Sequence, residues 1–299
     1  MEQKKAADTI YANKTVMGLP VKNSFMFTNA KGVEKKGIKK RQLNLLKKLE
    51  FLPRFLKGDE EVYLVTTACS PISIMEQLTT GAIVFYIKRS ILVFTNKRII
   101  HIPTTVGYNF RHSFAQIQYN DIRDIKLSWG ALRIRYANNK KERFIQIHRK
   151  ERAKIKQFIR KLNFNREASK YQQRYHICPS CMRSLKQGEY RCAACGLEFK
   201  SSGRAQLLSL VIPGGGYFYT GHWFLGIMDF IVEASLIYLA ANAYLNPDVT
   251  DVTKVIGTNE GVLYLAILAI EKIMTIYHAN HYVKEYIPVT TKYKQRVMA

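Results

Sequence analysis

The chain has 299 residues, of which 47% are apolar and 23% are charged, and its formal net charge is +25. This length allows two or three modules, and this apolar content excludes a chain that is disordered throughout. Residues 1–204 carry 41 lysines and arginines against 15 acidic residues, whereas residues 205–299 carry 6 against 7, so the basic excess lies in residues 1–204 and attracts nucleic acid or an anionic membrane face.

The first 57 residues form a basic N-terminal region. Its first thirty residues contain no long apolar run, so we expect no cleavable signal peptide and an N-terminus that stays in the cytosol. Residues 31–57 contain ten lysines and arginines against two glutamates and predict an amphipathic helix ending before Pro53, with one apolar side made of Ile38, Leu45, Leu46, Leu49 and Leu52. This helix either lies on an anionic lipid leaflet or packs its leucines on the domain that follows.

Residues 58–164 predict a β-rich domain. Turn signals separate short apolar runs that predict strands at 61–67, 82–88, 91–95, 98–103, 110–119, 125–128, 132–136 and 143–148. Apolar residues then recur at helical spacing and predict one amphipathic helix containing Ile155, Phe158, Ile159 and Leu162. About seven strands followed by one helix that closes an open barrel is pleckstrin-homology (PH) order. Cys69 lies at the end of the first predicted strand and is most simply a core residue.

Two segments of this domain resemble a known family. Residues 91–100 read ILVFTNKRII and residues 114–122 read FAQIQYNDI, which is similar to bacterial PH and GRAM-like domains, including those called YokE-like. The resemblance covers residues 58–164 and implies a binding platform rather than a catalyst.

The chain departs from the phosphoinositide-binding version of this fold. The first inter-strand connection, 68–81, contains no lysine or arginine, although that loop normally supplies the cations that hold the phosphates. We therefore do not expect specific inositol-lipid recognition. Four other cations either touch anionic headgroups nonspecifically or lie at solvated strand ends: Lys88, Arg89, Lys97 and Arg98.

Four cysteines predict a metal site in residues 165–200. They stand as C-x2-C-x10-C-x2-C, and four thiolates complete the closed tetrahedral shell of a structural zinc ion, with ligands Cys178, Cys181, Cys192 and Cys195. Iron in a rubredoxin-like site, two disulfides or four free thiols are the alternatives, and a cytosolic setting favours thiolates over disulfides. We expect a small zinc ribbon with no coordination position left open for a substrate.

Residues 205–285 predict a two-helix transmembrane module. Two apolar runs, 223–245 and 261–277, approach the length of about 20 residues that crosses a bilayer, and buried helices of a soluble domain are the alternative. The flanks of the pair are basic, whereas the connecting loop 246–260 holds three acidic residues against one lysine. Both ends are therefore expected in the cytosol of a bacterial inner membrane, with residues 286–299 as a basic cytosolic tail.

An apolar segment at 205–218 precedes the first span. Its Pro-Gly-Gly-Gly sequence at 213–216 breaks a helix, which predicts a short re-entrant or interfacial segment with Tyr217, Tyr219 and Trp223 at headgroup depth. The pattern P-G-x-G-x-x-Y-x-G resembles the turn of a small two-helix transmembrane module that often follows a zinc ribbon in bacterial proteins.

Ionisable residues lie inside the predicted spans, where they are costly. Two carboxylates are one turn apart on the first helix, and polar residues share a face of the second: Asp229 and Glu233, then Glu271, Thr275 and His278. We expect these groups to pair within or between hairpins near the interface. The alternative is a proton or metal site that also includes His281, although no catalytic spacing accompanies these residues.

The whole sequence predicts a multi-domain α+β membrane protein with a PH-like β-barrel and C-terminal helix, a zinc ribbon and an α-helical transmembrane hairpin. We expect a non-enzymatic scaffold or sensor that presents these modules to a protein, to anionic lipid or to both. A membrane-tethered nucleic-acid-binding protein is the alternative, which the weakly basic ribbon disfavours. A membrane enzyme or a proton-coupled carrier is the third possible function. Two spans per chain can enclose a transport path only in a homo-oligomer, and the sequence leaves the oligomeric state open.

Overall fold

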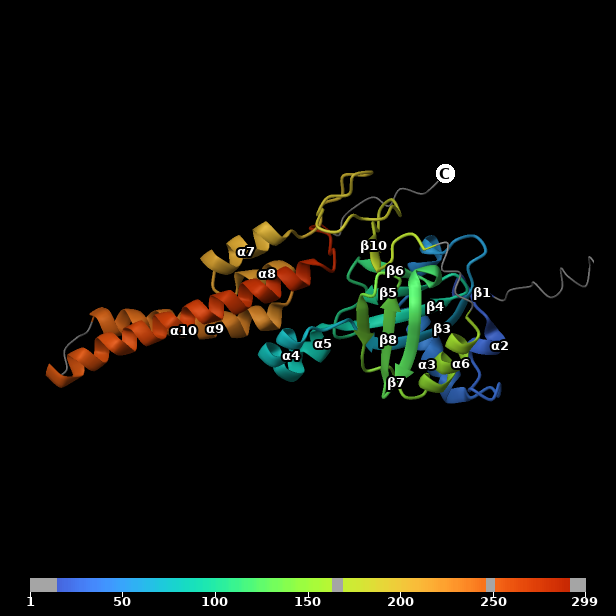
Figure 1. Cartoon of the computed structure of the whole chain (residues 1–299), viewed down its shortest axis with the longest axis horizontal. Helices are drawn as coiled ribbons and strands as arrows, with labels where there is room; N and C mark the ends of the chain where they lie inside the picture. Colours follow the sequence, from blue (N-terminus) through green and yellow to red (C-terminus); the bar gives the residue numbers. More distant parts are fainter. Residues whose placement is uncertain (1–14, 163–168, 246–250, 291–299) are drawn as a thin grey trace, which may run out of the picture. The chain divides into compact units, whose positions relative to one another are not determined.

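The computed structural model describes residues 15–162, 169–245 and 251–290 of the chain (Figure 1). Part of the predicted connecting loop, at 246–250, and most of the predicted basic tail, at 291–299, lie outside the described residues. The chain divides into two compact units. Unit 1 comprises Met1–Gln187 with Lys294–Ala299, and unit 2 comprises Gly188–Tyr293.

Two antiparallel sheets form the body of unit 1, with strand orders β10-β6-β5-β4-β3 and β7-β8-β9 (Figure 1). The strands are Val62–Cys69 (β3), Arg89–Thr95 (β4), Arg98–Pro103 (β5), Phe114–Gln118 (β6), Ile122–Ser128 (β7), Ala131–Tyr136 (β8), Lys141–Phe144 (β9) and Tyr175–Ile177 (β10). The predicted strands 110–119 and 143–148 are therefore shorter than expected. Among the described residues, one isolated bridge from Cys69 to Ile145 joins the two sheets, so the barrel is not closed.

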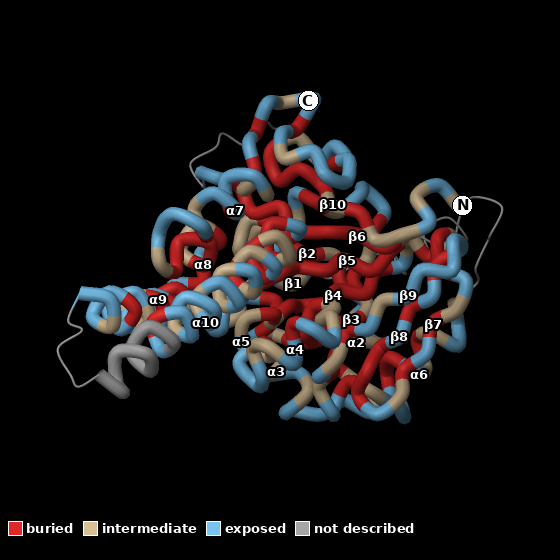
Figure 2. The backbone as a smooth tube through the Cα atoms, turned by 60° about the vertical axis from the view of Figure 1, so that its left-hand side comes forward, coloured by how far each residue is buried: buried red, intermediate tan, exposed pale blue. Residues whose placement is uncertain are grey.

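Helix α6, Arg152–Arg160, follows β9. Its Ile155 and Phe158 are buried against apolar residues of both sheets. β8 alternates between buried and exposed residues because only one of its faces is covered, whereas β4 and β5 are buried along almost their whole length. Both faces of the five-stranded sheet are therefore covered, which explains its unbroken apolar sequences (Figure 2).

The second face of the five-stranded sheet is covered by the N-terminal residues. These form β1 (Thr15–Val16), β2 (Leu19–Pro20), α2 (Asn23–Met26), α3 (Lys36–Lys47) and the 3-10 helix η1 (Leu52–Phe55). The leucines of the predicted apolar side are buried against this sheet: Leu45, Leu46, Leu49 and Leu52. The helix thus packs on the strand domain and does not offer its leucines to lipid. It ends at Lys47, earlier than predicted, because the chain then turns to bring the last two leucines into the core.

The connection between β3 and β4 is helical, so the strand predicted at 82–88 is wrong. The chain forms α4 (Ile74–Thr80), the 3-10 helix η2 (Gly81–Ile83) and α5 (Val84–Ile87). Ser73 starts α4 with a capping box. Its Oγ accepts the N–H of Glu76 (3.0 Å), and the Glu76 carboxylate accepts the N–H of Ser73 (2.9 Å). This local capping outweighs the β-propensity of the apolar residues that follow.

The turn between β4 and β5 accounts for the sequence TNKR. Thr95 Oγ1 accepts the backbone N–H groups of Lys97 (3.1 Å) and Arg98 (3.0 Å). The Arg98 side chain is buried and donates to Glu60 Oε2 (2.8 Å) and to the carbonyl oxygen of Phe55 (2.6 Å). These contacts therefore hold the turn in place.

The side chain of Asp121, in the sequence YNDI, holds the segment after α6 in place by accepting backbone hydrogen bonds. Its Oδ1 accepts the backbone N–H groups of Lys170 (2.9 Å), Tyr171 (3.0 Å) and Gln172 (3.1 Å). This contact leads the chain into β10, which adds to the edge of the first sheet beside β6.

The described part of unit 2 folds as helices α7 (Ser202–Val211), α8 (Gly215–Thr220), α9 (Trp223–Leu245) and α10 (Asp251–Val283) (Figure 1). The bounds of α9 equal those of the first predicted span. Because α10 begins at Asp251, most of the predicted connecting loop is helical. Two helices, Trp223–Leu245 and Glu260–Val283, are long and apolar enough to cross a membrane.

Asp229 and Glu233 of α9 are buried inside unit 2, whereas many apolar side chains of α9 and α10 lie outside. Glu233 is 0% exposed, whereas Phe230 is 48% exposed and Ile273 is 65% exposed. A water-soluble helix pair shows the reverse distribution, with its apolar side turned inward.

The Pro-Gly-Gly-Gly sequence allows close packing of the short helices in unit 2. Gly214 has φ +69°, and a Cβ there would collide with the carbonyl oxygen of Gly226; a Cβ at Gly216 would collide with Ser209 Oγ. The chain therefore breaks between α7 and α8. α7 also exposes Leu207, Leu210 and Val211. Its insertion at a membrane interface stays a prediction.

Leu46→Ala should destabilise unit 1 by about 2–5 kcal/mol, because Leu46 is fully buried and the substitution leaves a cavity. The measurement is denaturant unfolding of the detergent-solubilised chain, followed by hydrogen exchange of the β3 to β5 amides. Lys47→Ala, at the exposed end of the same helix, is the control and should change stability by less than about 0.5 kcal/mol. Equal effects of the two substitutions would contradict the packing of α3 on the sheet.

Candidate functional site

The segment from Cys178 to Arg183 forms a tight turn that carries two thiols. The N–H of Met182 donates to the carbonyl oxygen of Cys178 (3.0 Å), and the N–H of Cys178 donates to the carbonyl oxygen of Arg183 (2.9 Å). Met182 has a left-handed backbone, with φ +65°. This conformation reverses the chain immediately after Cys181.

The segment from Cys192 to Leu197 repeats this geometry. The N–H of Gly196 donates to the carbonyl oxygen of Cys192 (2.8 Å), and the N–H of Cys192 donates to the carbonyl oxygen of Leu197 (2.9 Å). Gly196 has φ +75°, a conformation that glycine adopts without steric cost. Cys195 occupies the position that Cys181 has in the first turn.

The two turns bring the four predicted ligands together. One ligand atom from each cysteine lies within 4.8 Å of all the others, and none of these described cysteines forms a disulfide. In a tetrahedral zinc site, with Zn–S bonds of about 2.3 Å, two sulfurs are about 3.8 Å apart. The four thiols therefore fit a closed metal site. Zinc as the metal, and the ribbon fold, stay predictions.

Cys69 is a core residue rather than a fifth ligand. It is 1% exposed, and its thiol lies 3.2 Å from the carbonyl oxygen of Phe85 and 3.2 Å from Gln146 Oε1. Burial raises the pKa of this thiol to about 11. The neutral form is therefore strongly favoured at physiological pH.

Cys178→Ser should remove one metal ion per chain, because three thiolates and a hydroxyl cannot complete the tetrahedral shell. Metal content per chain is the readout. Hydrogen exchange should become faster only near residues 175–200. Cys69→Ala is the matched control and should leave the metal content unchanged. Full metal loading of Cys178→Ser would reject the site.

The two classes of cysteine should also react differently with a thiol reagent. At pH 8, a thiol with a pKa of about 11 is ionised in about one molecule in a thousand. We expect four thiols per chain to react after chelation of the metal, and Cys69 to react only after unfolding. A fifth equivalent that reacts before unfolding would show that Cys69 is accessible.

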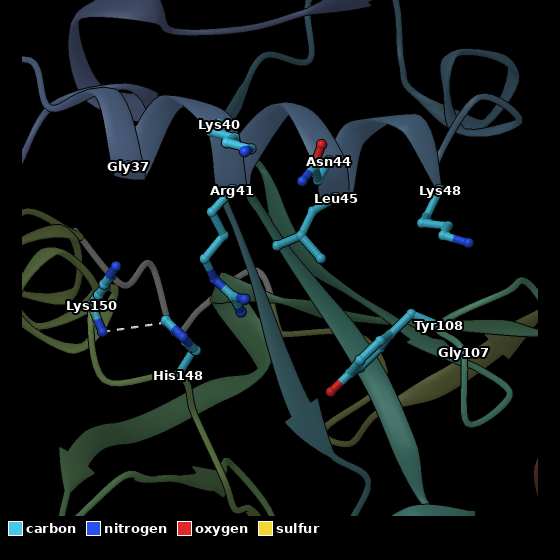
Figure 3. A pocket seen from close by; sticks show the side chains of 10 residues that line it. All are labelled: Gly37, Lys40, Arg41, Asn44, Leu45, Lys48, Gly107, Tyr108, His148 and Lys150. Atoms are coloured by element: carbon cyan, nitrogen blue, oxygen red, sulfur yellow. Dashed lines mark hydrogen bonds between the residues drawn. The ribbon is translucent and has the colours of Figure 1, made fainter.

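A basic pocket of about 440 Å³ lies in unit 1 beside α3 (Figure 3). Residues from three separate segments line it: Gly37, Lys40, Arg41, Asn44, Leu45 and Lys48 from α3 and its end, Gly107 and Tyr108 after β5, and His148 and Lys150 after β9. Figure 3 shows Arg41 pointing from α3 between Tyr108 and His148. No carboxylate is among the lining residues.

Glu151, which contacts two residues of the pocket lining, is already paired. Glu151 is 2% exposed; its Oε1 accepts from Arg41 Nε (2.7 Å), and its Oε2 lies 3.0 Å from His148 Nδ1. Burial lowers the pKa of His148, partly offset by Glu151, so the neutral imidazole is favoured at pH 7. The positive charge of the pocket therefore comes mainly from Lys40, Lys48 and Lys150.

Helices α4, η2 and α5 expose a group of large apolar side chains. Ile74 is 79% exposed and Leu78 is 73% exposed, and the group also includes Met75, Ile83 and Tyr86. Patches of exposed apolar residues mark surfaces that meet another molecule or a membrane. Because a strand was predicted at 82–88, the sequence did not indicate this exposed apolar surface.

Arg89 connects this apolar patch with the basic pocket. Its guanidinium lies 4.9 Å from the ring centre of Tyr86, in the patch, and 5.2 Å from that of Tyr108, in the pocket lining. Both distances are those of cation–π contacts. The patch and the pocket are thus neighbouring parts of unit 1.

Two of the other cations considered from the sequence are buried in ion pairs, so they are neither headgroup ligands nor solvated strand ends, whereas contact of Lys97 with headgroups stays a prediction. Lys88 is 2% exposed and pairs with Glu76 (3.4 Å), and Arg98 is buried on Glu60. Lys97 pairs with Asp59. Sequence alone could not identify these partners, because they lie on segments that only the folded sheet brings together.

Three carboxylates converge in unit 2, as the spacing on the two helices indicated. Ligand atoms of Asp229 and Glu233 on α9 and of Glu271 on α10 lie within 4.8 Å of one another. Thr275 Oγ1 lies 3.1 Å from Glu271 Oε2 and 3.2 Å from Asp229 Oδ2. Lys272 Nζ donates to Glu233 Oε2 (2.7 Å). Lys272 was not among the residues expected from the sequence, although a lysine inside a predicted span was the signal that could have identified it.

The two histidines considered with these carboxylates are not part of the converging group. His278 Nδ1 lies 2.5 Å from Tyr217 Oη. His281 lies in the last turn of α10. The five-residue proton or metal site considered from the sequence therefore reduces to three carboxylates with Lys272 and Thr275.

Comparison with protein families shows that residues 56–163 match the family described as Bacterial PH domain. The match covers 108 of the 299 residues and includes β3 to β9 and α6. The match supports a PH-like domain within unit 1, while the expected bounds of 58–164 and the GRAM-like and YokE-like subtypes stay predictions. Comparison with curated proteins found no match to the chain.

Proposed function

We propose that this protein is a non-enzymatic membrane scaffold or sensor whose PH-like domain binds anionic lipid headgroups. A PH-like domain indicates a role in binding lipid or protein. The observation that carries the choice of lipid is the basic pocket beside the exposed apolar helices α4 and α5. Cations that meet phosphates, next to apolar side chains that enter the interface, are the two elements of peripheral membrane binding.

The helices of unit 2 supply the membrane anchor in this proposal. α9 and the second half of α10 reach spanning length and turn apolar side chains outward. With basic residues flanking the pair, both ends of the chain lie in the cytosol of a bacterial inner membrane. Unit 1 then works at the anionic cytoplasmic leaflet, where each lysine near the surface contributes about 1 kcal/mol of attraction.

The pocket is suited to a general preference for anionic lipid rather than to one inositol phosphate. Its cations are mainly lysines, which act as point charges, and its one arginine is already held by Glu151. The connection 68–81, which normally grips inositol phosphates, carries no cation. The four-cysteine site, with zinc as the proposed metal, has no open position and serves as a rigid element for docking an unidentified protein.

Lipid binding can be measured on the full chain in nanodiscs of zwitterionic or of partly anionic lipid. In anionic discs we expect slower hydrogen exchange at residues 36–48 and at 74–87, and loss of this protection in high salt. Lys40→Glu with Lys150→Glu should abolish the difference between the two lipids.

Lys126→Glu with Lys141→Glu provides a control with the same charge change at exposed positions outside the pocket. This variant should retain the protection. If the control and the pocket variant behave alike, the pocket is not the lipid site. If the chain instead binds DNA with a steep salt dependence and ignores anionic lipid, the nucleic-acid alternative replaces the proposal.

A further inference from the structure

The carboxylate cluster of unit 2 has an unbalanced charge. The cluster carries three negative charges when Asp229, Glu233 and Glu271 are ionised. Among the described residues, it forms an ion pair with one cation, Lys272. The remaining charge is −2. Asp229 is 5% exposed and Glu233 is 0% exposed, so water does not stabilise this charge as it would at a surface.

Glu233 also presents a buried oxygen that lacks a partner. Its Oε2 accepts from Lys272 Nζ (2.7 Å) and from the backbone N–H of Gly214 (3.2 Å). Its Oε1 is buried and has no hydrogen-bond partner among the described residues. Two donors thus orient the carboxylate through one oxygen and leave the other available as a ligand.

We propose that this cluster binds one hard divalent cation, with carboxylate oxygens of Asp229, Glu233 and Glu271 as its protein ligands. Three carboxylates, one ammonium and one divalent cation sum to zero charge. An all-oxygen set of this kind suits Ca²⁺, Mn²⁺ or Mg²⁺ rather than the softer metals that thiolates select.

The distances between the donor atoms are compatible with such an ion. Two oxygens on one cation lie at most twice the metal–oxygen distance apart, which is about 5 Å for Ca²⁺ and about 4 Å for Mg²⁺. The three carboxylate ligand atoms lie within 4.8 Å of one another. A cation of Ca²⁺ size therefore fits with little movement of the side chains.

The proposed site would connect the elements of unit 2. α9 supplies Asp229 and Glu233, and α10 supplies Glu271. Lys272 also donates to the carbonyl oxygen of Ser209 in α7 (2.8 Å), so the same network reaches the short helix before the Gly-rich turn. A cation bound here would hold α9 and α10 together through charge, next to the buried Asp229 and Glu233.

The experiment uses the full detergent-solubilised chain, with its cysteine site loaded with zinc, and titrates Mn²⁺ by electron paramagnetic resonance. We expect one Mn²⁺ per chain that Ca²⁺ displaces. Glu233→Gln should weaken Mn²⁺ binding roughly tenfold or more. Glu260→Gln, an exposed carboxylate on the same helix as Glu271, is the matched control and should bind as the unaltered chain does.

Lys272→Met should change the affinity for Mn²⁺ in the opposite direction to Glu233→Gln. Removing the ammonium leaves three carboxylates for the cation, so Mn²⁺ binding should become tighter, roughly tenfold or more. A misfolded variant cannot show such a gain. The proposal is wrong if the unaltered chain binds no Mn²⁺ and infrared spectra show protonated carboxyl groups that Glu271→Gln removes, or if Glu233→Gln binds Mn²⁺ normally. Neither result bears on lipid binding by unit 1.

Discussion

The outward apolar surface of α9 and α10 is the constraint on which the proposed biology depends. Phe230 and Ile273 are about half to two-thirds exposed while Glu233 is fully buried, a distribution that water penalises and a lipid bilayer favours. In such a setting the carboxylates need partners inside the helix pair; Lys272 and Thr275 supply part of them, and the proposed cation would supply the rest. As the proposed membrane anchor, this helix pair would keep unit 1 near a membrane.

Within unit 1, the basic and apolar surfaces come from segments that the core does not use. The leucines of α3 fill the core, so the lysines of the same helix face outward and line the pocket. The connection between β3 and β4 begins with a capping box, and its helices turn Ile74 and Leu78 outward. Arg89 contacts aromatic rings of both parts. In these segments, some side chains therefore pack in the core, and others face outward and form the basic and apolar surfaces.

The two clusters of potential metal ligands are chemically distinct. The cysteines form a closed set of four soft donors held by two matching backbone turns, whereas the carboxylates form a set of hard oxygen donors next to a lysine. Thiolates select zinc or iron, and carboxylates select Ca²⁺, Mg²⁺ or Mn²⁺. One chain can therefore hold a structural metal and a different cation without competition between the sites.

The sequence by itself determined the features that depend on neighbours along the chain. These are the two cysteine turns, the apolar length of α9, the apolar spacing of α6 and the TNKR turn, because each arises from local geometry or composition. Tertiary structure alone decided that the leucines of α3 face the sheet, that Lys88 and Arg98 are buried in ion pairs, and that three distant segments form the pocket. An amphipathic helix or a cation is stabilised by any suitable partner, and only the folded chain determines which partner is within reach.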